Sequence, residues 1–465
     1  MFDQSKQNYD VVIVGSGPAG MSAAVEADAR GLSAVVLDEQ PEPGGQVFRA
    51  VASNRLPDRE ILGSDYYSGA ALVQAFRDCG AAYLPGATAW EVNSDLRVAY
   101  SRNGAAGFLQ GRTLVIATGA LERSMPIPGW TLPGVMTVGS AQILLKSESA
   151  VPQGRYALAG TGPLLVLTAL QLCRCGAPPV AIVETGSRHK AGPFLSDPHG
   201  SFFGIRTLTK GLSWMRELRR YGVPHFHEAD KLAAHGSRRL TGISFQHSGG
   251  TERLELDTLF LHQGVVPHLN LAASLECRVE WVEDKKLWQP VTGKTGLSSR
   301  KGVYIVGDSA EILGADAAQV SGRLAALAIA QELCGQDTAG AREANLRRLT
   351  SERRFRRPLD LAYLPQQHHL VPEEDDTIVC RCESVTAGEL RQAARNGCAG
   401  INQLKFFTRA GMGPCQARTC GVTVSMLMAV TMNRPPPDVG YVSIRPPVKP
   451  VPLLWLADLA QEIES

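Results

Sequence analysis

The sequence has almost no excess of charge and no long apolar run. It holds 47 Lys and Arg residues against 45 Asp and Glu residues, a formal net charge of +2 over 465 residues, which offers no electrostatic basis for a nucleic-acid partner. Met1–Asn8 is short and polar, unlike a signal peptide, and no later segment reaches the length of a membrane span. We therefore expect no nucleic-acid partner, no transmembrane segment and a cytoplasmic location, which is compatible with peripheral binding at the inner face of a membrane.

The cysteines lack the pattern of a disulfide-stabilised protein. Ten are spread over 465 residues, and a chain of this length buries large cores in two or three domains without such bridges. Five of the ten lie between positions 380 and 420. In a reducing compartment this clustering indicates metal binding or redox chemistry.

A dinucleotide-binding pattern occupies Tyr9–Gln46. The apolar run Val11–Val14 predicts a buried parallel strand, and Gly15-x-Gly17-x-x-Gly20 predicts a tight turn into a helix whose free N–H groups face a pyrophosphate. A second strand is predicted over Ala34–Leu37 and is followed by an acid, where a carboxylate accepts from a ribose hydroxyl. A glycine turn alone is a weak signal, but here every part is in register. The expected cofactor contacts are Gly15, Gly17, Pro18, Ala19, Gly20, Asp38, Glu39 and Gln40.

The choice of dinucleotide rests on a resemblance. Pro43-Gly44-Gly45-Gln46 resembles the stretch after the ribose-binding acid in flavoprotein disulfide-reductase-like enzymes. There, small residues let the chain pass beside the flavin. The resemblance favours FAD over NAD and adds Gly45 and Gln46 to the expected contacts.

Two later strand ends support the same interpretation. Thr113–Leu121 predicts a strand ending in Ala117-Thr118-Gly119, and Gly302–Asp308 predicts another ending in Gly307-Asp308. In the enzymes that these motifs resemble, the first backbone passes the FAD and the aspartate accepts from a ribitol hydroxyl. The helix after the aspartate, predicted to start near Ala317, would direct its N-terminus at the flavin. Ala89 lies in a predicted antiparallel insertion, Tyr83–Phe108, and either contacts adenine or packs as an ordinary strand residue.

A second nucleotide-type unit begins at Tyr156. Gly160-x-Gly162 follows a predicted strand, but Leu165 occupies the third glycine position, and its side chain would push the helix away from the strand. We expect a degenerate NAD(P) site, with a nucleotide of another kind left open. No Cys-x-x-Cys or Cys-x4-Cys closely follows either glycine turn, so the dithiol through which thiol reductases of this fold pass electrons is missing.

The late cysteines form two unequal pairs. Cys380-x-Cys382 and Cys415-x4-Cys420 are separated by 32 residues. Soft sulfur ligands select zinc or iron–sulfur. Structural zinc sites favour Cys-x2-Cys hooks, whereas a [2Fe–2S] centre spreads its ligands over two irons. A zinc-bound scaffold and metal-free thiols remain as alternatives. Between the pairs, Thr386–Asn396 predicts a helix with a capping box formed by Thr386 and Glu389.

The segments TIVCRCESV and TRAGMGPCQARTCG are similar to the bacterioferritin-associated ferredoxin-like [2Fe–2S] domain. In particular they resemble the version fused to the FAD-binding α subunits of opine oxidases, D-hydroxyproline dehydrogenases, hydrogen cyanide synthase and heterotetrameric sarcosine oxidase. HQGVVPH, VYIVGD and RPPVKPVPLLWLA fit the same family. The resemblance implies that Cys380, Cys382, Cys415 and Cys420 are the cluster ligands, with Cys398 outside the set.

The resemblance implies an α/β fold with two dinucleotide-binding domains, disulfide-reductase-like, and a small C-terminal helical [2Fe–2S] domain. Gly335–Gln367 carries a run of charge that predicts a solvated helix and linker, with a docking surface for a partner as the alternative. The expected parts are 9–122 (FAD-binding, first part), 123–268 (second Rossmann-like domain), 269–335 (FAD-binding, return), 336–375 (linker), 376–432 ([2Fe–2S]-binding) and 433–465 (proline-rich C-terminal arm).

The family resemblance also implies partners. Its α subunits pair with a flavoprotein β subunit like D-amino-acid oxidase, which oxidises the carbon–nitrogen bond of an amino or imino acid, and in some cases with a small γ subunit. Reducing equivalents pass to the α subunit, often by way of an FMN at the interface, and on to the respiratory chain or a quinone. We expect an α subunit that transfers electrons, and we assign no catalytic residue. The rivals are a stand-alone NAD(P)H-dependent FAD/[2Fe–2S] reductase and a hydrogen cyanide synthase subunit.

Overall fold

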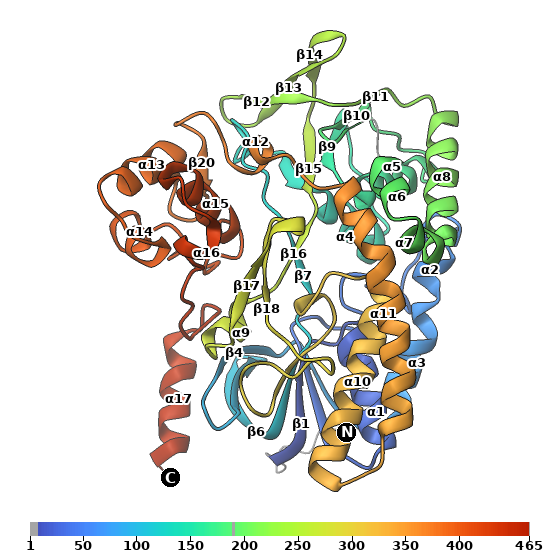
Figure 1. Cartoon of the computed structure of the whole chain (residues 1–465), viewed down its shortest axis with the longest axis vertical. Helices are drawn as coiled ribbons and strands as arrows, with labels where there is room; N and C mark the ends of the chain where they lie inside the picture. The colour runs from blue at the N-terminus through green and yellow to red at the C-terminus, as the bar shows by residue number, and fades with distance from the viewer. Residues whose placement is uncertain (1–7, 188–190, 465) are drawn as a thin grey trace.

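A computed structural model describes residues 8–187 and 191–464. Most of the polar leader Met1–Asn8, together with Ser465, therefore lies outside the described residues. The chain forms two nucleotide-type domains, a small cysteine-bearing domain and a separate C-terminal helix (Figure 1). Within the described residues no helix is long and apolar enough to cross a bilayer.

The first domain is built on a seven-stranded sheet with the order β3-β2-β1-β6-β5-β4, in which β19 also pairs with β6. Its parallel half joins β3, β2, β1, β6 and β19, and its antiparallel half joins β4, β5 and β6. The strands are β1 (Asn8–Val14), β2 (Ala34–Asp38), β3 (Ala82–Pro85), β4 (Thr88–Val92), β5 (Arg97–Arg102), β6 (Ala105–Ile116) and β19 (Val303–Ile305).

Helices cover one face of the parallel half. A Cβ on Gly322 would stand 2.0 Å from the carbonyl oxygen of Ala19, so only glycine allows α10 to approach α1 this closely. The helices of this region are α1 (Pro18–Ala29), α2 (Ser64–Tyr67), α3 (Gly69–Asp78), α9 (Asn270–Ser274), α10 (Ala315–Cys334) and the short 3₁₀ turns η1 (Glu283–Lys285) and η2 (Gly307–Ser309). Strands β17 (Val279–Val282) and β18 (Leu287–Pro290) form an antiparallel hairpin.

The second domain holds a five-stranded parallel sheet, β11-β10-β9-β15-β8, and a three-stranded antiparallel sheet, β12-β13-β14. Strands β7 (Ala120–Glu122) and β16 (Val265–Pro267) pair where the chain crosses between the domains. The other strands are β8 (Val135–Thr137), β9 (Tyr156–Thr161), β10 (Ala181–Glu184), β11 (His225–Phe226), β12 (Asp230–Gly236), β13 (Leu240–His247), β14 (Gly250–Glu255) and β15 (Thr258–Gln263). The helices are α4 (Val138–Glu148), α5 (Pro163–Arg174), α6 (Ala191–Ser196), α7 (Pro198–Phe203) and α8 (Ile205–Arg220).

The C-terminal part returns over both domains. Helix α11 crosses from α10 to α6 and α7, and α17 packs against the antiparallel half of the first sheet (Figure 1). Between them lies a small domain of short elements. Its elements and the flanking helices are α11 (Ala339–Ala362), α12 (Gln367–Leu370), β20 (Ile378–Cys380), β21 (Val385–Thr386), α13 (Ala387–Arg395), α14 (Ile401–Thr408), α15 (Gly421–Met432), α16 (Pro436–Val439) and α17 (Leu453–Glu464).

Local predictions hold with two differences. The capping box of Thr386 and Glu389 at the start of α13 is confirmed. Residues 83–85, expected in the antiparallel insertion, instead belong to the parallel edge strand β3 next to β2, because Leu84 is buried in the first core. The helix expected in the linker is present as α11, but it is not wholly solvated, because Leu349 and Phe355 are buried.

Candidate functional site

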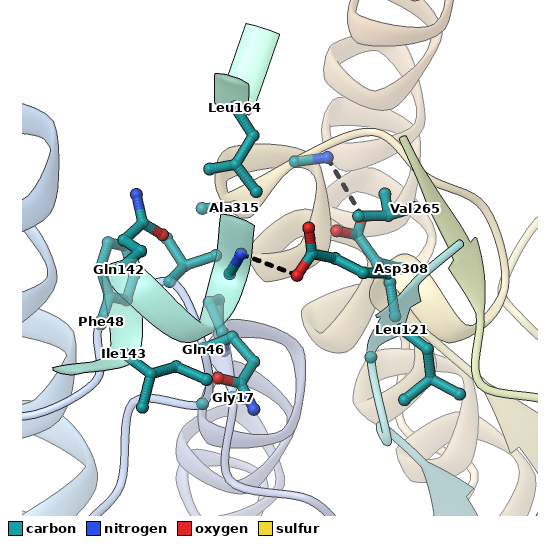
Figure 2. A pocket seen from close by; sticks show the side chains of 18 of the residues that line it. Gly17, Gln46, Phe48, Leu121, Gln142, Ile143, Leu164, Val265, Asp308 and Ala315 are labelled. Carbon is teal, nitrogen blue, oxygen red and sulfur yellow. Dashed lines mark hydrogen bonds between the residues drawn. The ribbon is translucent and has the colours of Figure 1, made fainter. Parts of the chain in front are cut away.

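A cavity of about 1860 Å³ lies between the first domain, the second domain and the cysteine-bearing domain. Figure 2 shows Gly17 and Gln46 of the first domain, Gln142 and Leu164 of the second, and Asp308 around the same space. Of the expected cofactor contacts, all line this cavity except Gly20 and Gly307. The structure thus brings together residues 15–46, Ala89, 117–119 and Asp308, which are far apart in the sequence.

The glycines of the first turn have different tasks. A Cβ on Gly15 would stand 2.4 Å from the carbonyl oxygen of Ala117, and one on Gly20 would stand 1.8 Å from that of Gly15. These two positions therefore allow close packing of helix and strand. Gly17 differs, because its nearest protein neighbour, the Cα of Gly45, lies 3.8 Å from the Cβ position. The free space at Gly17 is on the cavity side, where a phosphate would approach.

Two expected acidic contacts are held in defined orientations. Asp38 accepts hydrogen bonds at Oδ2 from the Ser16 backbone N (2.5 Å) and hydroxyl (2.7 Å). These bonds join the glycine turn to the end of strand β2. The Oδ1 of Asp38 accepts from the Gln40 backbone N at 2.8 Å. A carboxylate offers about four acceptor positions, which leaves about one for a ribose hydroxyl. Glu39 pairs with Lys449 at 2.6 Å, which ties the C-terminal arm to the cavity rim.

Asp308 orients the start of α10. Its Oδ1 accepts from the backbone N of Leu313 at 3.0 Å and of Gly314 at 3.1 Å. Helix α10 begins directly afterwards, at Ala315, two residues earlier than expected, and its first turn lines the cavity. A helix N-terminus stabilises negative charge, which suits a reduced, anionic flavin.

Lys146 is a cavity residue that sequence reasoning missed. Its buried Nζ donates to the carbonyl oxygens of Gln46 and Val47 and to Gln142 Oε1, each at 3.0 Å. Burial, with the nearby charge of Arg49, lowers the pKa of Lys146 to about 7. In the sequence Lys146 follows the apolar run Ile143–Leu145 and precedes Ser147 and Glu148, so it looks like an ordinary lysine near the end of a helix.

The second glycine turn is closed by protein atoms. The Nε2 of His262 lies 2.8 Å from the Cβ position of Gly162, and Leu165 is fully buried. The other ring nitrogen of His262, Nδ1, is 2.6 Å from Glu122 Oε1, so His262 is held by hydrogen bonding to Glu122. Neither Gly160 nor Gly162 lines the large cavity.

The four expected cluster cysteines gather in two pairs. Cys380 interacts with Cys420, and Cys382 interacts with Cys415. The Cys420 thiol and neighbouring N–H groups, including that of Gly411, lower the pKa of Cys380 to about 6 against the opposing effect of burial. Among the described residues, no three of these four sulfurs lie within 4.8 Å of one another. A single tetrahedral zinc ion would hold its sulfurs about 3.8 Å apart.

The loop between Cys415 and Cys420 packs against the wall of the large cavity. Arg418 Nε donates to His268 Nε2 at 3.1 Å, and Asn270 Nδ2 donates to the Gln416 carbonyl at 2.7 Å. His268 in turn donates its backbone N–H to the Gly119 carbonyl. The residues of the small domain that line the cavity are Arg381, Cys415, Arg418 and Thr419.

The sequence is similar to known protein families and to individual proteins over most of its length. Residues 9–331 match the family model described as pyridine nucleotide-disulphide oxidoreductase, and residues 374–459 match the sarcosine oxidase A3 domain. The A subunit of opine oxidase from Agrobacterium tumefaciens is 40% identical over 471 residues, which cover 97% of this chain and 92% of that protein. Hydrogen cyanide synthase subunit HcnB of Pseudomonas aeruginosa is 31% identical over 486 residues, which cover 98% of this chain and 100% of that protein.

The fold is likewise similar to a solved structure. L-proline dehydrogenase from P. horikoshii aligns with a TM-score of 0.70 at 18% identity, over 97% of this chain and 80% of that chain. The expected fold is therefore confirmed. The chain belongs to the pyridine nucleotide-disulphide oxidoreductase family, together with the A subunits of opine oxidase, and is a flavoprotein oxidoreductase.

Proposed function

We propose that the chain is the electron-transferring FAD/[2Fe–2S] subunit of a heteromeric dehydrogenase that oxidises the carbon–nitrogen bond of an amino or imino acid. The bond-breaking site lies on a flavoprotein partner subunit. Full-length similarity to the A subunit of opine oxidase supports the assignment. One observation carries it: Cys415 and the residues around it line the same cavity as the dinucleotide-binding turn and Asp308.

The residues present fit FAD. The open side of Gly17 would admit the pyrophosphate, Asp38 has acceptor capacity for the ribose, and Ala117–Gly119 supply backbone without large side chains. Asp308 fixes the start of α10 toward the cavity. Lys146 holds the Gln46–Val47 segment in place through its carbonyl groups.

The four cysteines fit a [2Fe–2S] centre better than a single zinc ion. Two sulfur pairs, Cys380 with Cys420 and Cys382 with Cys415, match a ligand set divided over two irons. The Gly411 N–H directed at Cys380 Sγ (3.5 Å) is the kind of contact that tunes the potential of such a centre. A flavin exchanges two electrons and the cluster one at a time, so a chain that holds both serves as an electron relay.

Three features weigh against an NAD(P)H-dependent reductase. Leu165 replaces the third glycine, His262 occupies the space beside Gly162, and two histidines engage Glu184, the acid at the end of the second strand of this unit. The test is anaerobic mixing of the purified chain with NADH. We expect no rapid bleaching of the flavin; bleaching without a partner would overturn the relay assignment in favour of the reductase.

The partner assignment needs a second experiment. Co-expression with the products of neighbouring genes should yield a complex with a flavoprotein subunit, with or without an FMN at the interface and a small third subunit. Opines, D-hydroxyproline, sarcosine and glycine are the substrates to compare, with a quinone as acceptor. Turnover of an amine by the isolated chain would contradict the proposal.

A hydrogen cyanide synthase subunit is the second candidate, because HcnB aligns over its whole length. The substrate panel separates the two: cyanide released from glycine by the complex would favour the second candidate. Iron and acid-labile sulfide in a two-to-two ratio per chain would support the cluster in either case. Zinc without iron would instead support a structural metal.

A further inference from the structure

A cluster of metal-ligand side chains lies in the second domain, away from the large cavity. Glu184 ends β10, and His225 begins the neighbouring strand β11. The two strands are parallel with Ile182 beside His225 and Val183 beside Phe226. This register brings Glu184 beside His227.

The strand geometry places both imidazoles on one face. Strand β11 ends at Phe226, and His227 follows it directly. Side chains alternate along an extended chain, so His225 and His227 point the same way and Phe226 points the other. The ring of Phe226 packs on Phe245 with centroids 5.1 Å apart, whereas the rings of His225 and His227 lie 4.1 Å apart. A hydrophobic anchor thus orients the histidine pair toward Glu184.

The distances suit a shared ion. His225 Nε2 and His227 Nδ1 each lie 3.2 Å from the same oxygen, Oε2 of Glu184. All three ligand atoms lie within 4.8 Å of one another. Zinc binds imidazole nitrogen and carboxylate oxygen at about 2.0–2.2 Å, so neighbouring ligand atoms of a tetrahedral site are about 3.3 Å apart.

The hydrogen bonding of His227 supports the same conclusion. Its Nδ1 atom is buried and, although close to Glu184, has no hydrogen-bond partner. His227 Nδ1 lies 3.2 Å from Glu184 Oε2 but is not aligned for a hydrogen bond with it, so the nitrogen is directed at the space beside that oxygen. A nitrogen lone pair in a metal site has this orientation, because it points at the ion and not at the other ligand. Glu184 is 1% exposed, and its Oε2 is also hydrogen-bonded to His225 Nε2 at 3.2 Å, so the carboxylate is held in a fixed position beside both imidazoles.

We infer that Glu184, His225 and His227 bind one divalent transition-metal ion of the zinc class, with water completing the coordination. Two imidazoles and one carboxylate form a ligand set that such ions accept. The ion would join β10 to β11 at the place where a nucleotide-binding unit carries its ribose-binding acid. The site is independent of the proposed electron relay, since none of its ligands lines the large cavity.

A second group, Asp230, His368 and His369, offers a matched control. Its ligand atoms also lie within 4.8 Å of one another, but the side chains of Asp230 and His368 are 47% and 35% exposed. His368 and His369 are adjacent in the short helix α12, and Asp230 is free to be solvated without an ion. We therefore expect no tight binding there.

The test is Co²⁺ binding to the cluster-loaded, FAD-loaded chain without a histidine tag, after treatment with a chelator. We expect one tightly bound Co²⁺ per chain, displaced by Zn²⁺, with visible d–d absorption and no thiolate-to-cobalt charge-transfer band. Glu184→Gln and His227→Ala should each weaken binding at least tenfold, whereas Asp230→Asn should leave it unchanged.

Thermal unfolding keeps the test decisive if a variant is less stable. Zn²⁺ should raise the unfolding temperature of the unmodified chain and of Asp230→Asn but not of Glu184→Gln. Unchanged Co²⁺ affinity in Glu184→Gln, loss of binding in Asp230→Asn, or a spectrum with thiolate bands alone would each overturn the inference. None of these outcomes depends on amine oxidation, so failure of the proposed function is distinguishable.

Discussion

Arg418 Nε donates a hydrogen bond to Nε2 of His268 at 3.1 Å, between residues 150 positions apart in the chain. Arg418 lies between two expected cluster ligands. The His268 carbonyl accepts from the Thr118 hydroxyl, and the His268 backbone N–H donates to the Gly119 carbonyl. Burial, with the nearby charges of Arg418 and Lys449, lowers the pKa of His268 to about 3, so the imidazole is neutral and accepts. This contact fixes the cluster loop against the expected flavin-binding loop.

Replacing Arg418 by alanine should loosen that attachment. The change removes donors from His268 Nε2 and from the Val448 carbonyl, and unsatisfied buried acceptors cost roughly 1–3 kcal/mol each. We expect a lower unfolding temperature, retained FAD and slower electron exchange between the two centres, measured by stopped-flow absorbance after partial reduction. Arg409→Ala is the matched control, because Arg409 is exposed and pairs only with Glu383 among the contacts described. Equal rates in both variants would refute the role of the Arg418 contact.

Gly17→Ala should separate cofactor binding from folding. The added Cβ meets no protein atom closer than 3.8 Å, so the chain should fold, but the methyl group would occupy the approach of the phosphate. We expect loss of most of the visible flavin absorbance per chain, with the far-ultraviolet circular dichroism unchanged. Gly20→Ala should instead destabilise the fold, since its Cβ would clash with the Gly15 carbonyl.

Gly340→Ala provides the control for these glycine changes. Gly340 lies in α11 with open space around its Cβ position, and alanine in a helix is favoured over glycine by roughly 0.5–1 kcal/mol. FAD content should stay the same and stability should rise slightly. Full FAD retention in Gly17→Ala would contradict the assigned phosphate position.

The cysteines should divide sharply in their effect on iron content. Cys382→Ser removes an exposed thiol that is paired with Cys415, and we expect loss of most iron and acid-labile sulfide. Cys398→Ala alters a buried thiol in the same small domain, and iron should be retained because Cys398 belongs to neither pair. Retained iron in Cys382→Ser, or iron loss in Cys398→Ala, would show that the ligand set is wrong.

Sequence reasoning succeeded where a local pattern dictates a local structure. The Gly15–Gly20 turn and the Thr386 capping box depend on residues a few positions apart, so spacing alone predicts them. It also reached contacts that recurring motifs carry, such as Asp308 at the cavity. The family resemblance supplied the four expected cluster ligands. Cysteine spacing alone left both a zinc ion and an iron–sulfur cluster open.

The remainder depended on packing between distant segments. Lys146 reaches the Gln46 and Val47 carbonyls across about a hundred positions, and nothing near Lys146 in the sequence signals this contact. The arginines of α11 predict a solvated helix and linker. In the structure, the side chains of Leu349 and Phe355 are nevertheless buried. His225 and His227 are two residues apart in the sequence, but the register of β10 and β11 brings them to Glu184. The sequence alone does not reveal that register.

Stability should fall as the solution is acidified from pH 6.5 toward pH 4, and His369 should account for part of the loss. Burial, with the neighbouring His368, lowers the pKa of His369 from its ordinary 6.5 to about 4. Between these values the unfolded chain binds the proton and the folded chain does not, so each unit of acidification costs up to about 1.4 kcal/mol, and about 3 kcal/mol over the whole interval. His369→Gln, which cannot titrate, should show a shallower decline in the urea midpoint between pH 6.5 and 4.5. Acid loss of cofactors affects both proteins alike, so the difference between their slopes is the measurement, and parallel slopes would rule out a contribution from His369.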